Sequence, residues 1–427
     1  MLEFLRQPIT FKRPGSAKPP AETGDAPQSV PGAENLPLDG ASKPAQRRNG
    51  ASRSGARRVA RPRRSPTLVG LDIEPGLLVA AKSHLNGGPV VEHAAFLPID
   101  TDIVRDGEVN DVPSLVTGLA ELFKGSHLDR RVRIGIANQR ILMRRIELPP
   151  LTNSVEIEQA VHFQAQDEIP MPLDTVVFDY HVLGIVEREE GPRLQVLLVA
   201  ARRDMVERVL QAARLAGLQP EGVDLAAFGM IRALHPAATG DERILYLAIG
   251  GLTNIAIARG LTCEFTRVIP TGVEQVASDV AARGAVTLDA ARRLLTTMSA
   301  SVVSGEAHHG ESATAAVADE PAHAHDPASS PADLGALAHA VLDEGVRRIG
   351  SEIRNSLDFY LTAQDAGAVT RAMLTGPALE IPGFDAALSR ELGITVQRAE
   401  VKVSGLTDVP ASVLPVAAGL SVAEGLQ

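Results

Sequence analysis

The chain has 427 residues, of which 44% are hydrophobic, 22% are charged and only 3% are aromatic, with one cysteine and no tryptophan. A single cysteine excludes an internal disulfide framework, and no apolar run approaches the roughly 18 residues that a membrane-spanning helix requires. The formal net charge of −10 is uneven, since residues 1–66 carry +8 and the remaining residues carry −18, and for an acidic body we expect no nucleic acid partner.

Residues 1–66 are rich in Pro, Ala, Gly, Ser and Arg and show no hydrophobic period, so we expect a disordered basic N-terminal tail. Between Arg47 and Arg64 there are eight arginines and no acidic residue. Such a cluster suits an anionic membrane surface, at about 1 kcal/mol per basic residue. It is equally typical of a tail that only keeps a protein soluble, and the sequence leaves both interpretations open.

The first structured segment is predicted to be a hairpin. Residues 68–82 read LVGLDIEPGLLVAAK, which predicts a strand, a short turn containing Gly76 and a second strand. A turn at Asn86 and Gly87 then leads to a third strand near 90–95. Asp111 is expected to cap a helix that ends near Gly125.

Two further helices are predicted from their caps. Asn153 and Glu156 form a capping box for a helix that extends to Gln166. A strand at 195–200 follows, and Asp204 is expected to cap the helix after it.

The hairpin sequence then recurs at an offset of 176 residues. Residues 244–258 read ILYLAIGGLTNIAIA, again two apolar strands around a glycine turn, and a third strand is expected near 263–269. Thr287 is predicted to begin a helix, and the longest helix is predicted at about 342–361 from its apolar period.

A low-complexity stretch lies near 302–332, and we expect it to be a disordered insertion. It contains four histidines, namely His308, His309, His323 and His325. A metal site is conceivable from this composition, but the stretch lacks both cysteine and regular ligand spacing.

Two similar halves that each open with a hairpin resemble the actin/Hsp70/hexokinase superfamily, in which both turns point into a cleft and cradle nucleotide phosphates. Three other stretches narrow the resemblance. The first is RRIELP at 144–149, which leads through a helix to EIPMPLD at 168–174, and the second is the strand at 195–200, which runs into ARRDMV at 201–206. The third is LTG at 374–376 followed by IPGF at 381–384. In this order they are similar to PilM-type proteins of type IV pilus assembly, which are relatives of FtsA.

The resemblance implies a two-lobed α/β actin-like ATPase fold built from duplicated ribonuclease-H-like lobes. Lobe I is expected at 67–240 and comprises subdomains 1A and 1C, with 1C near 145–225. Lobe II is expected at 241–427 and comprises subdomains 2A and 2B.

The resemblance also implies a nucleotide site. It gives Asp72 the role of orienting magnesium if Mg-ATP is bound, and it gives nucleotide contacts to six residues: Asp72, Gly76, Gly250, Gly251, Thr253 and Gly376. From the residues alone, Asp72 is also explained as a carboxylate that caps local N–H groups, and Gly250 with Gly251 as an ordinary tight hairpin turn.

The departures from the family pattern fall on this chemistry. Glu74 puts negative charge beside the phosphate position, Pro75 has no N–H to donate, and Ala248 replaces the second metal-orienting Asp. Loss of one preorganised group commonly costs roughly 3–4 kcal/mol of transition-state stabilisation. We therefore expect weak or lost binding of ATP and magnesium and little hydrolysis.

The function implied by the resemblance is a cytoplasmic scaffold at the membrane periphery. It docks the cytoplasmic tail of a PilN-like membrane protein near subdomain 1C and is coupled to pilus motor ATPases. One alternative is an active ATP-binding and hydrolysing switch. The other is an FtsA-like division filament protein, which is disfavoured because residues 414–427 are Ala-rich and contain no basic residue.

Overall fold

The computed structural model describes residues 68–236, 240, 242–298, 331–363, 366–405 and 408–422. The whole of the predicted basic tail at 1–66 lies outside these ranges. Most of the predicted insertion near 302–332, with its four histidines, lies outside them as well.

The first sheet has the strand order β10-β6-β1-β2-β3-β16. These strands span, in that order, Gln219–Leu225, Arg131–Ile136, Val69–Glu74, Leu77–Leu85, Pro89–Pro98 and Lys402–Val403. Strands β1, β2 and β3 form an antiparallel meander, whereas β6 lies parallel to β1 and β10 parallel to β6. The predicted first hairpin is therefore confirmed, and it supplies the centre of this sheet.

The second sheet has the order β13-β12-β11-β14-β15. Its strands span Thr262–Ile269, Thr253–Arg259, Arg243–Ile249, Val369–Thr375 and Thr395–Arg398. Here too the first three strands along the chain form an antiparallel meander, and the next two are parallel to the first. Apart from β16, both sheets thus share one order, 5-4-1-2-3 by position in their own half, which confirms the duplication that the repeated hairpin indicated.

Four helices cover the first sheet. They are α1 (Val112–Leu122), α3 (Arg203–Leu215), α4 (Ala226–Leu234) and α10 (Pro415–Ser421). Helices α1 and α3 contact each other, and α4 contacts α10. Helix α4 also contacts strands of the second sheet, so the hydrophobic core continues from Leu71 and Ala226 to Tyr246 and Ala248.

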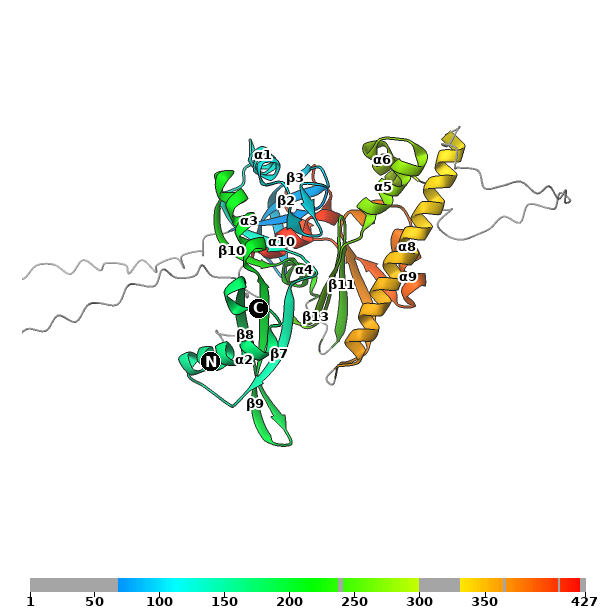
Figure 1. Ribbon diagram of the computed structural model, residues 1–427. Helices are drawn as coiled ribbons and strands as arrows, with labels where there is room; N and C mark the ends of the chain where they lie inside the picture. The colour runs from blue at the N-terminus through cyan, green and yellow to red at the C-terminus, as the bar shows by residue number, and fades with distance from the viewer. Residues whose placement is uncertain are drawn as a thin grey trace, which may run out of the picture. The chain divides into compact units, whose positions relative to one another are not determined.

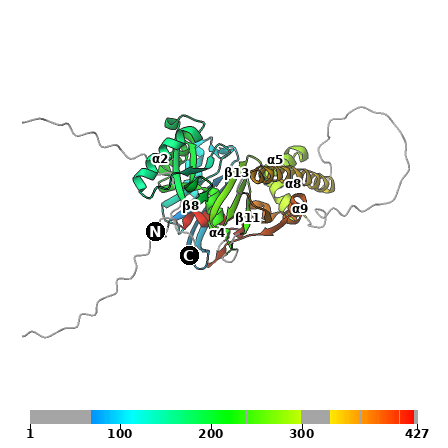
Figure 2. The ribbon, with the colours of Figure 1, turned by 90° about the horizontal axis from the view of Figure 1, so that it is seen from below.

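The second sheet packs against α5 (Val273–Gly284), α6 (Leu288–Thr297), α8 (Pro331–Leu361) and α9 (Phe384–Leu392). Figures 1 and 2 show α8 on the side of this sheet that faces away from α2. Helix α8 begins eleven residues before the predicted start at 342 because its apolar stripe continues through the buried Ala338 and Val341.

A third, three-stranded sheet has the order β7-β9-β8, with strands at Leu142–Leu148, Gly191–Arg202 and Val176–Arg188. Helix α2 (Ser154–Glu168) packs on it through Ile157, Val161 and Ala165. The remaining elements are the small hairpin β4 (Val104–Arg105) and β5 (Glu108–Val109), and the 3-10 turns η2 (Leu173–Thr175), η3 (Pro377–Glu380) and η4 (Ala411–Val413).

The C-terminal segment returns to the first sheet. Strand β16 pairs in parallel with β3, and α10 contacts β1, β2 and β6. The expectation that 241–427 form one half therefore differs from the structure at β16 and α10. The apolar surface of Val416 and Leu420 belongs to the core of the first sheet, and this long-range contact leaves no local signal in the sequence.

Two predicted helix caps and one predicted helix start are confirmed, and one predicted cap is wrong. Asp111, Asn153 and Thr287 each accept a backbone hydrogen bond at the N-terminus of α1, α2 and α6. Asp204 does not cap α3, because β9 runs directly into that helix and Arg202 takes the cap position. The Asp204 carboxylate instead accepts from Nε of Arg202 at 3.0 Å.

Candidate functional site at the paired turns

The turn between β1 and β2 presents two carboxyl groups from one face of β1. Asp72 and Glu74 are two residues apart and therefore point to the same side of the strand. Both line a small cavity that also includes Ala248, Thr375 and Gly376. The end of β1 is thus brought against the ends of β11 and β14, as the resemblance implied for a nucleotide site.

The two hairpin turns touch each other directly. The Gly251 N–H donates a hydrogen bond to Oε2 of Glu74 at 3.3 Å. A Cβ added to Gly250 would lie 2.3 Å from this oxygen, and one added to Gly251 would lie 2.1 Å from the backbone oxygen of Pro75. Glycine is required here because the opposite turn approaches so closely.

The two carboxyl groups at this contact, those of Asp72 and Glu74, have raised pKa values. Burial raises the pKa of Asp72 from 3.8 to about 7, and the hydrogen bond from the Ile73 backbone opposes the rise only in part. Burial also raises the pKa of Glu74 well above 4.5, and the nearby Asp72 carboxylate adds to the rise. Both shifts follow from placing carboxyl groups together in a region from which water is excluded.

The other residues predicted for the site are held by local partners. The hydroxyl of Thr253, which is fully buried, donates to the carbonyl of Thr271 at 2.7 Å. Gly376 has φ +95° and donates its N–H to the carbonyl of Ser412 at 2.8 Å. Gly76, with φ +87°, lies in the first turn beside the side chain of Glu274. The structure therefore brings Asp72 and Gly376 to one cavity and Gly251 to Glu74, whereas the hydroxyl of Thr253 is directed to its own loop.

The space at the turns does not fit a magnesium nucleotide. The cavity beside Asp72 and Glu74 has a volume of about 10 Å³, close to the smallest that admits one water molecule. A second hollow of about 250 Å³ begins at Pro75 and Gly251, but its lining includes three acidic residues, Asp102, Asp106 and Glu274. Its single cation, Arg105, is paired with Asp102 at 2.6 Å. Phosphate has no room in the first cavity, and in the second hollow it would meet negative charge.

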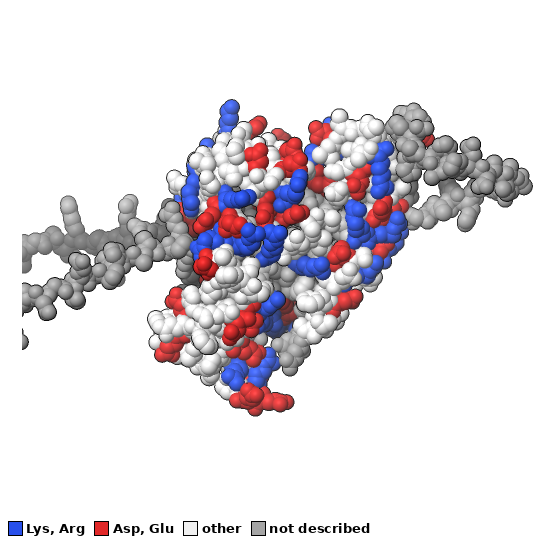
Figure 3. Space-filling view, in the orientation of Figure 1, with Lys and Arg blue, Asp and Glu red and all other residues white. Residues whose placement is uncertain are grey.

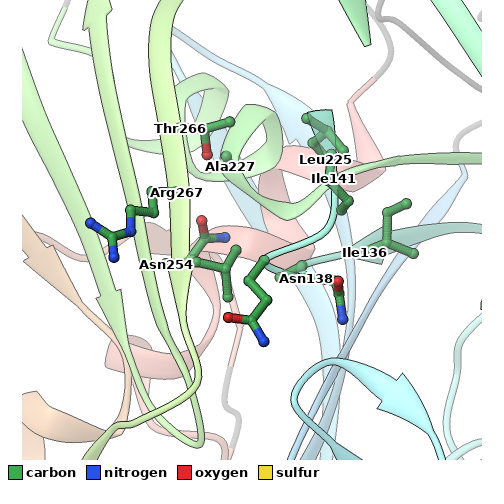
Figure 4. Close-up of a pocket in the computed structure, with 11 residues that line it drawn as sticks. Ile136, Asn138, Ile141, Leu225, Ala227, Asn254, Thr266 and Arg267 are labelled. Carbon is green, nitrogen blue, oxygen red and sulfur yellow. The ribbon is translucent and has the colours of Figure 1, made fainter. Parts of the chain in front are cut away.

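A third cavity, of about 70 Å³, lies between the two large sheets (Figure 4). It is bounded by Asn138 and Leu225, which belong to the first half, and by Asn254, Thr266 and Arg267, which belong to the second. Asn254 is 3% exposed, and its Oδ1 has no hydrogen-bond partner within the described ranges.

The sequence reasoning missed two contributors to the site. The Ser412 carbonyl accepts from both Gly376 and the Thr375 hydroxyl, so the C-terminal segment supports the end of β14. Glu274, at the start of α5, is ion-paired with Arg292 at 2.7 Å and lies beside Gly76. An acidic residue in the first turn of a helix is common, so the sequence around Glu274 did not indicate its contacts with Arg292 and Gly76.

Figure 3 shows Lys and Arg side chains interspersed with Asp and Glu over one face of the described chain, so on this face the charges form no stripe of a single sign. In the part of the chain that the structure describes, no group of three or more His, Cys, Asp or Glu residues is arranged to hold a metal ion. Among the described helices, none has the length and apolarity needed to cross a bilayer.

Two sheets of one order, with the first turn of each meeting at their boundary, form an actin-like fold. The sequence profile described as type IV pilus assembly protein PilM matches residues 70–295, which is more than half of the chain. The chain therefore belongs to the PilM family of type IV pilus assembly proteins.

One solved structure has a similar fold, and two others match this chain less well. The structure titled "PilM-PilN type IV pilus biogenesis complex" matches with a TM-score of 0.64 and 23% identity, over 83% of this chain and 97% of that one. The ethanolamine utilization protein EutJ from Carboxydothermus hydrogenoformans matches with a TM-score of 0.45 and 15% identity, over 84% and 89% of the two chains. MreB5 of Spiroplasma citri bound to ADP matches with a TM-score of 0.44 and 12% identity, over 82% and 94%.

Proposed function

We propose that this chain is a cytoplasmic scaffold of type IV pilus assembly, peripheral to the membrane, that docks the cytoplasmic tail of a PilN-like membrane protein. Membership of the PilM family supports the pathway. A related fold that is solved in a complex of PilM with PilN supports the partner. In this proposal the first and third sheets form subdomains 1A and 1C of lobe I, and the second sheet with its helices forms lobe II.

The geometry of the third sheet is the observation that carries the docking role. Strands β7 and β8 are its edges, and within the described ranges neither pairs with a strand other than β9. The edge strand of a sheet can accept an extended peptide through main-chain hydrogen bonds. Two large apolar side chains are exposed nearby, Phe163 of α2 at 69% and Ile185 of β8 at 58%.

Binding of a fluorescently labelled peptide with the sequence of the PilN-like tail tests this proposal. Phe163→Ser should weaken binding about tenfold or more if Phe163 contacts the peptide. Phe359→Ser is the matched control, because Phe359 is 67% exposed on α8 of the other half and should leave the affinity within about twofold. Equal affinities of both variants and the unmodified chain would place the docking site elsewhere.

The nucleotide site is proposed to be degenerate. Ala248 supplies no carboxylate and Pro75 supplies no N–H. The Gly251 N–H already donates its hydrogen bond to Glu74. Titration of the full chain with labelled ATP and magnesium should give no saturation at millimolar ATP and no turnover. Saturation at micromolar ATP would favour the alternative, an ATP-dependent switch that uses Asp72, Gly76, Gly250, Gly251, Thr253 and Gly376.

Two further contacts belong to this proposal and depend on other tests. Coupling to the pilus motor ATPases should appear as co-purification of a motor with the scaffold and the PilN-like protein together. Contact of residues 47–64 with anionic membrane should appear as salt-sensitive binding to phosphatidylserine vesicles.

A further inference from the structure

The second turn has an amide that is already hydrogen-bonded to another part of the chain. In a phosphate-binding hairpin, backbone N–H groups of the turn are the donors that recognise the anion. Here the donor is the N–H of Gly251, and its acceptor is Oε2 of Glu74, from the other half of the protein. A carboxylate and a phosphate offer the same kind of acceptor oxygen to such an amide.

We propose that Glu74 is an internal ligand of the second turn, which excludes nucleotide phosphate and holds the two halves together without nucleotide. This inference rests on the proposed degenerate site and names the residue that makes it so. Glu74 is therefore the specificity-determining residue of the cleft.

The placement of Glu74 is determined by β1. Glu74 is the last residue of that strand and pairs with Leu77 across the first turn. Strand β1 is held on both sides, by β2 and by β6. The side chain therefore extends from a rigid strand end, and little further ordering is needed to reach Gly251.

The backbone of the first turn closes the same contact. The oxygen of Pro75 approaches Gly251 so nearly that a Cβ there would lie at 2.1 Å, and a Cβ on Gly250 would lie 2.3 Å from Glu74 Oε2. The turns are thus in contact along two successive residues on each side. A phosphate could reach the Gly251 amide only by displacing Glu74 and separating the turns.

A displaced Glu74 would leave the phosphate in unfavourable surroundings. Asp72 lines the same cavity, and Glu274 lies beside Gly76 on the outer side of the turn. Burial raises the pKa of both Asp72 and Glu74, and a protonated Glu74 still offers its carbonyl oxygen to the Gly251 N–H. The internal contact therefore persists in either protonation state, whereas a phosphate would add charge to the cluster.

Hydrogen exchange at single amides measures this contact directly. In Glu74→Ala the exchange of the Gly251 amide should accelerate about fivefold or more, since it loses its acceptor. In Glu74→Gln the amide oxygen of the new side chain can still accept, and the rate should stay within about twofold. The Gly250 amide, which donates to the carbonyl of Leu252 within its own turn at 2.9 Å, is the internal control and should not change.

Binding of inorganic triphosphate to the full chain measures the exclusion. Glu74→Ala should bind triphosphate at least about tenfold more tightly than the unmodified chain. Glu274→Gln is the matched control, because it removes one negative charge near the turn without freeing the Gly251 amide. It should gain less than about threefold.

The two proposals fail in different ways. If unmodified protein binds Mg-ATP at micromolar concentration, the proposed degenerate site is wrong. If it does not bind ATP, and Glu74→Ala changes neither Gly251 exchange nor triphosphate affinity, the degenerate site stands and the role of Glu74 is overturned. An equal gain in Glu274→Gln would also overturn it, because net charge alone would then explain the exclusion.

Discussion

The guanidinium of Arg145, on β7, lies 3.9 Å from the carboxylate of Glu264, on β13, and so connects the third sheet to the second. The same carboxylate accepts from Arg243 at 2.9 Å and from the Tyr360 hydroxyl at 2.6 Å. The Glu264 side chain is 3% exposed. One buried carboxylate therefore organises groups from β7, β11, β13 and α8 at the boundary of the two halves.

Glu264→Ala should lower the free energy of unfolding by about 3 kcal/mol, since it removes the hydrogen bonds that this buried carboxylate accepts from Arg243 and Tyr360. Arg145→Ala is the control and should cost less than about 1 kcal/mol, because its contact is long and its side chain is partly exposed. Urea unfolding of both variants measures the difference. Equal losses would show that the bridge between the sheets, and not the buried carboxylate, is the important part.

Gly251→Ala should destabilise the closed turns by about 1–3 kcal/mol, because its Cβ would overlap the Pro75 oxygen. Gly260→Ala is the matched control in the next turn, where φ is +60° but an added Cβ meets nothing within 4 Å. It should cost only the backbone strain, about 1 kcal/mol. Thermal unfolding distinguishes the two, and the idea of contacting turns fails if Gly260→Ala is the more damaging change.

Stability should fall as pH rises from about 4 to about 7. In this window the folded protein keeps the proton on Asp72, whose pKa is raised to about 7, whereas the unfolded chain has lost it near 3.8. The unfolded state binds fewer protons, so the free energy of unfolding decreases by up to about 1.4 kcal/mol per pH unit.

Asp72→Asn should remove much of that slope and be more stable than the unmodified chain at pH 8. Part of the slope should remain, because the raised pKa of Glu74 acts in the same direction. Urea unfolding between pH 4.5 and 8 provides the comparison. A slope unchanged by the substitution would mean that Asp72 is already ionised in the folded protein.

Ala248→Asp should not restore a metal site by itself. Ala248 is 3% exposed and shares its small cavity with Asp72 and Glu74, so a third carboxyl group there should cost about 3 kcal/mol. Ala248→Ser is the control for adding a polar group without charge and should cost about 1 kcal/mol. Urea unfolding with and without about 10 mM magnesium checks both variants. If magnesium fully restored the stability of Ala248→Asp, this expectation would be wrong.

Much of the local structure was readable from local chemistry. The hairpins at 68–82 and 244–258 were predicted because apolar strands and glycine turns have short-range signatures. The helix starts at Asp111, Asn153 and Thr287 were predicted for the same reason. The cap at Asp204 was wrong because the preceding strand enters the helix without a break, which depends on the pairing of β9 within its sheet.

The candidate site could be predicted from the sequence only in part. The repeated hairpin places both turns at equivalent ends of the central strands β1 and β11. It therefore brings together Asp72, Gly250, Gly251 and Gly376. The sequence also indicated that Glu74 and Pro75 would oppose phosphate. That Glu74 reaches the Gly251 amide could not be predicted, because residues 177 positions apart meet only through the packing of the two sheets.

By itself the sequence determined the two hairpins, the starts of α1, α2 and α6, the duplication and the departures from the family pattern at Glu74, Pro75 and Ala248, since each depends on residue type and near neighbours. Only the tertiary structure decided that β16 and α10 return to the first sheet and that the Gly251 N–H of the second turn donates to Glu74 of the first. Those outcomes arise from burial of apolar surface between distant segments, which is non-directional and carries no local signature.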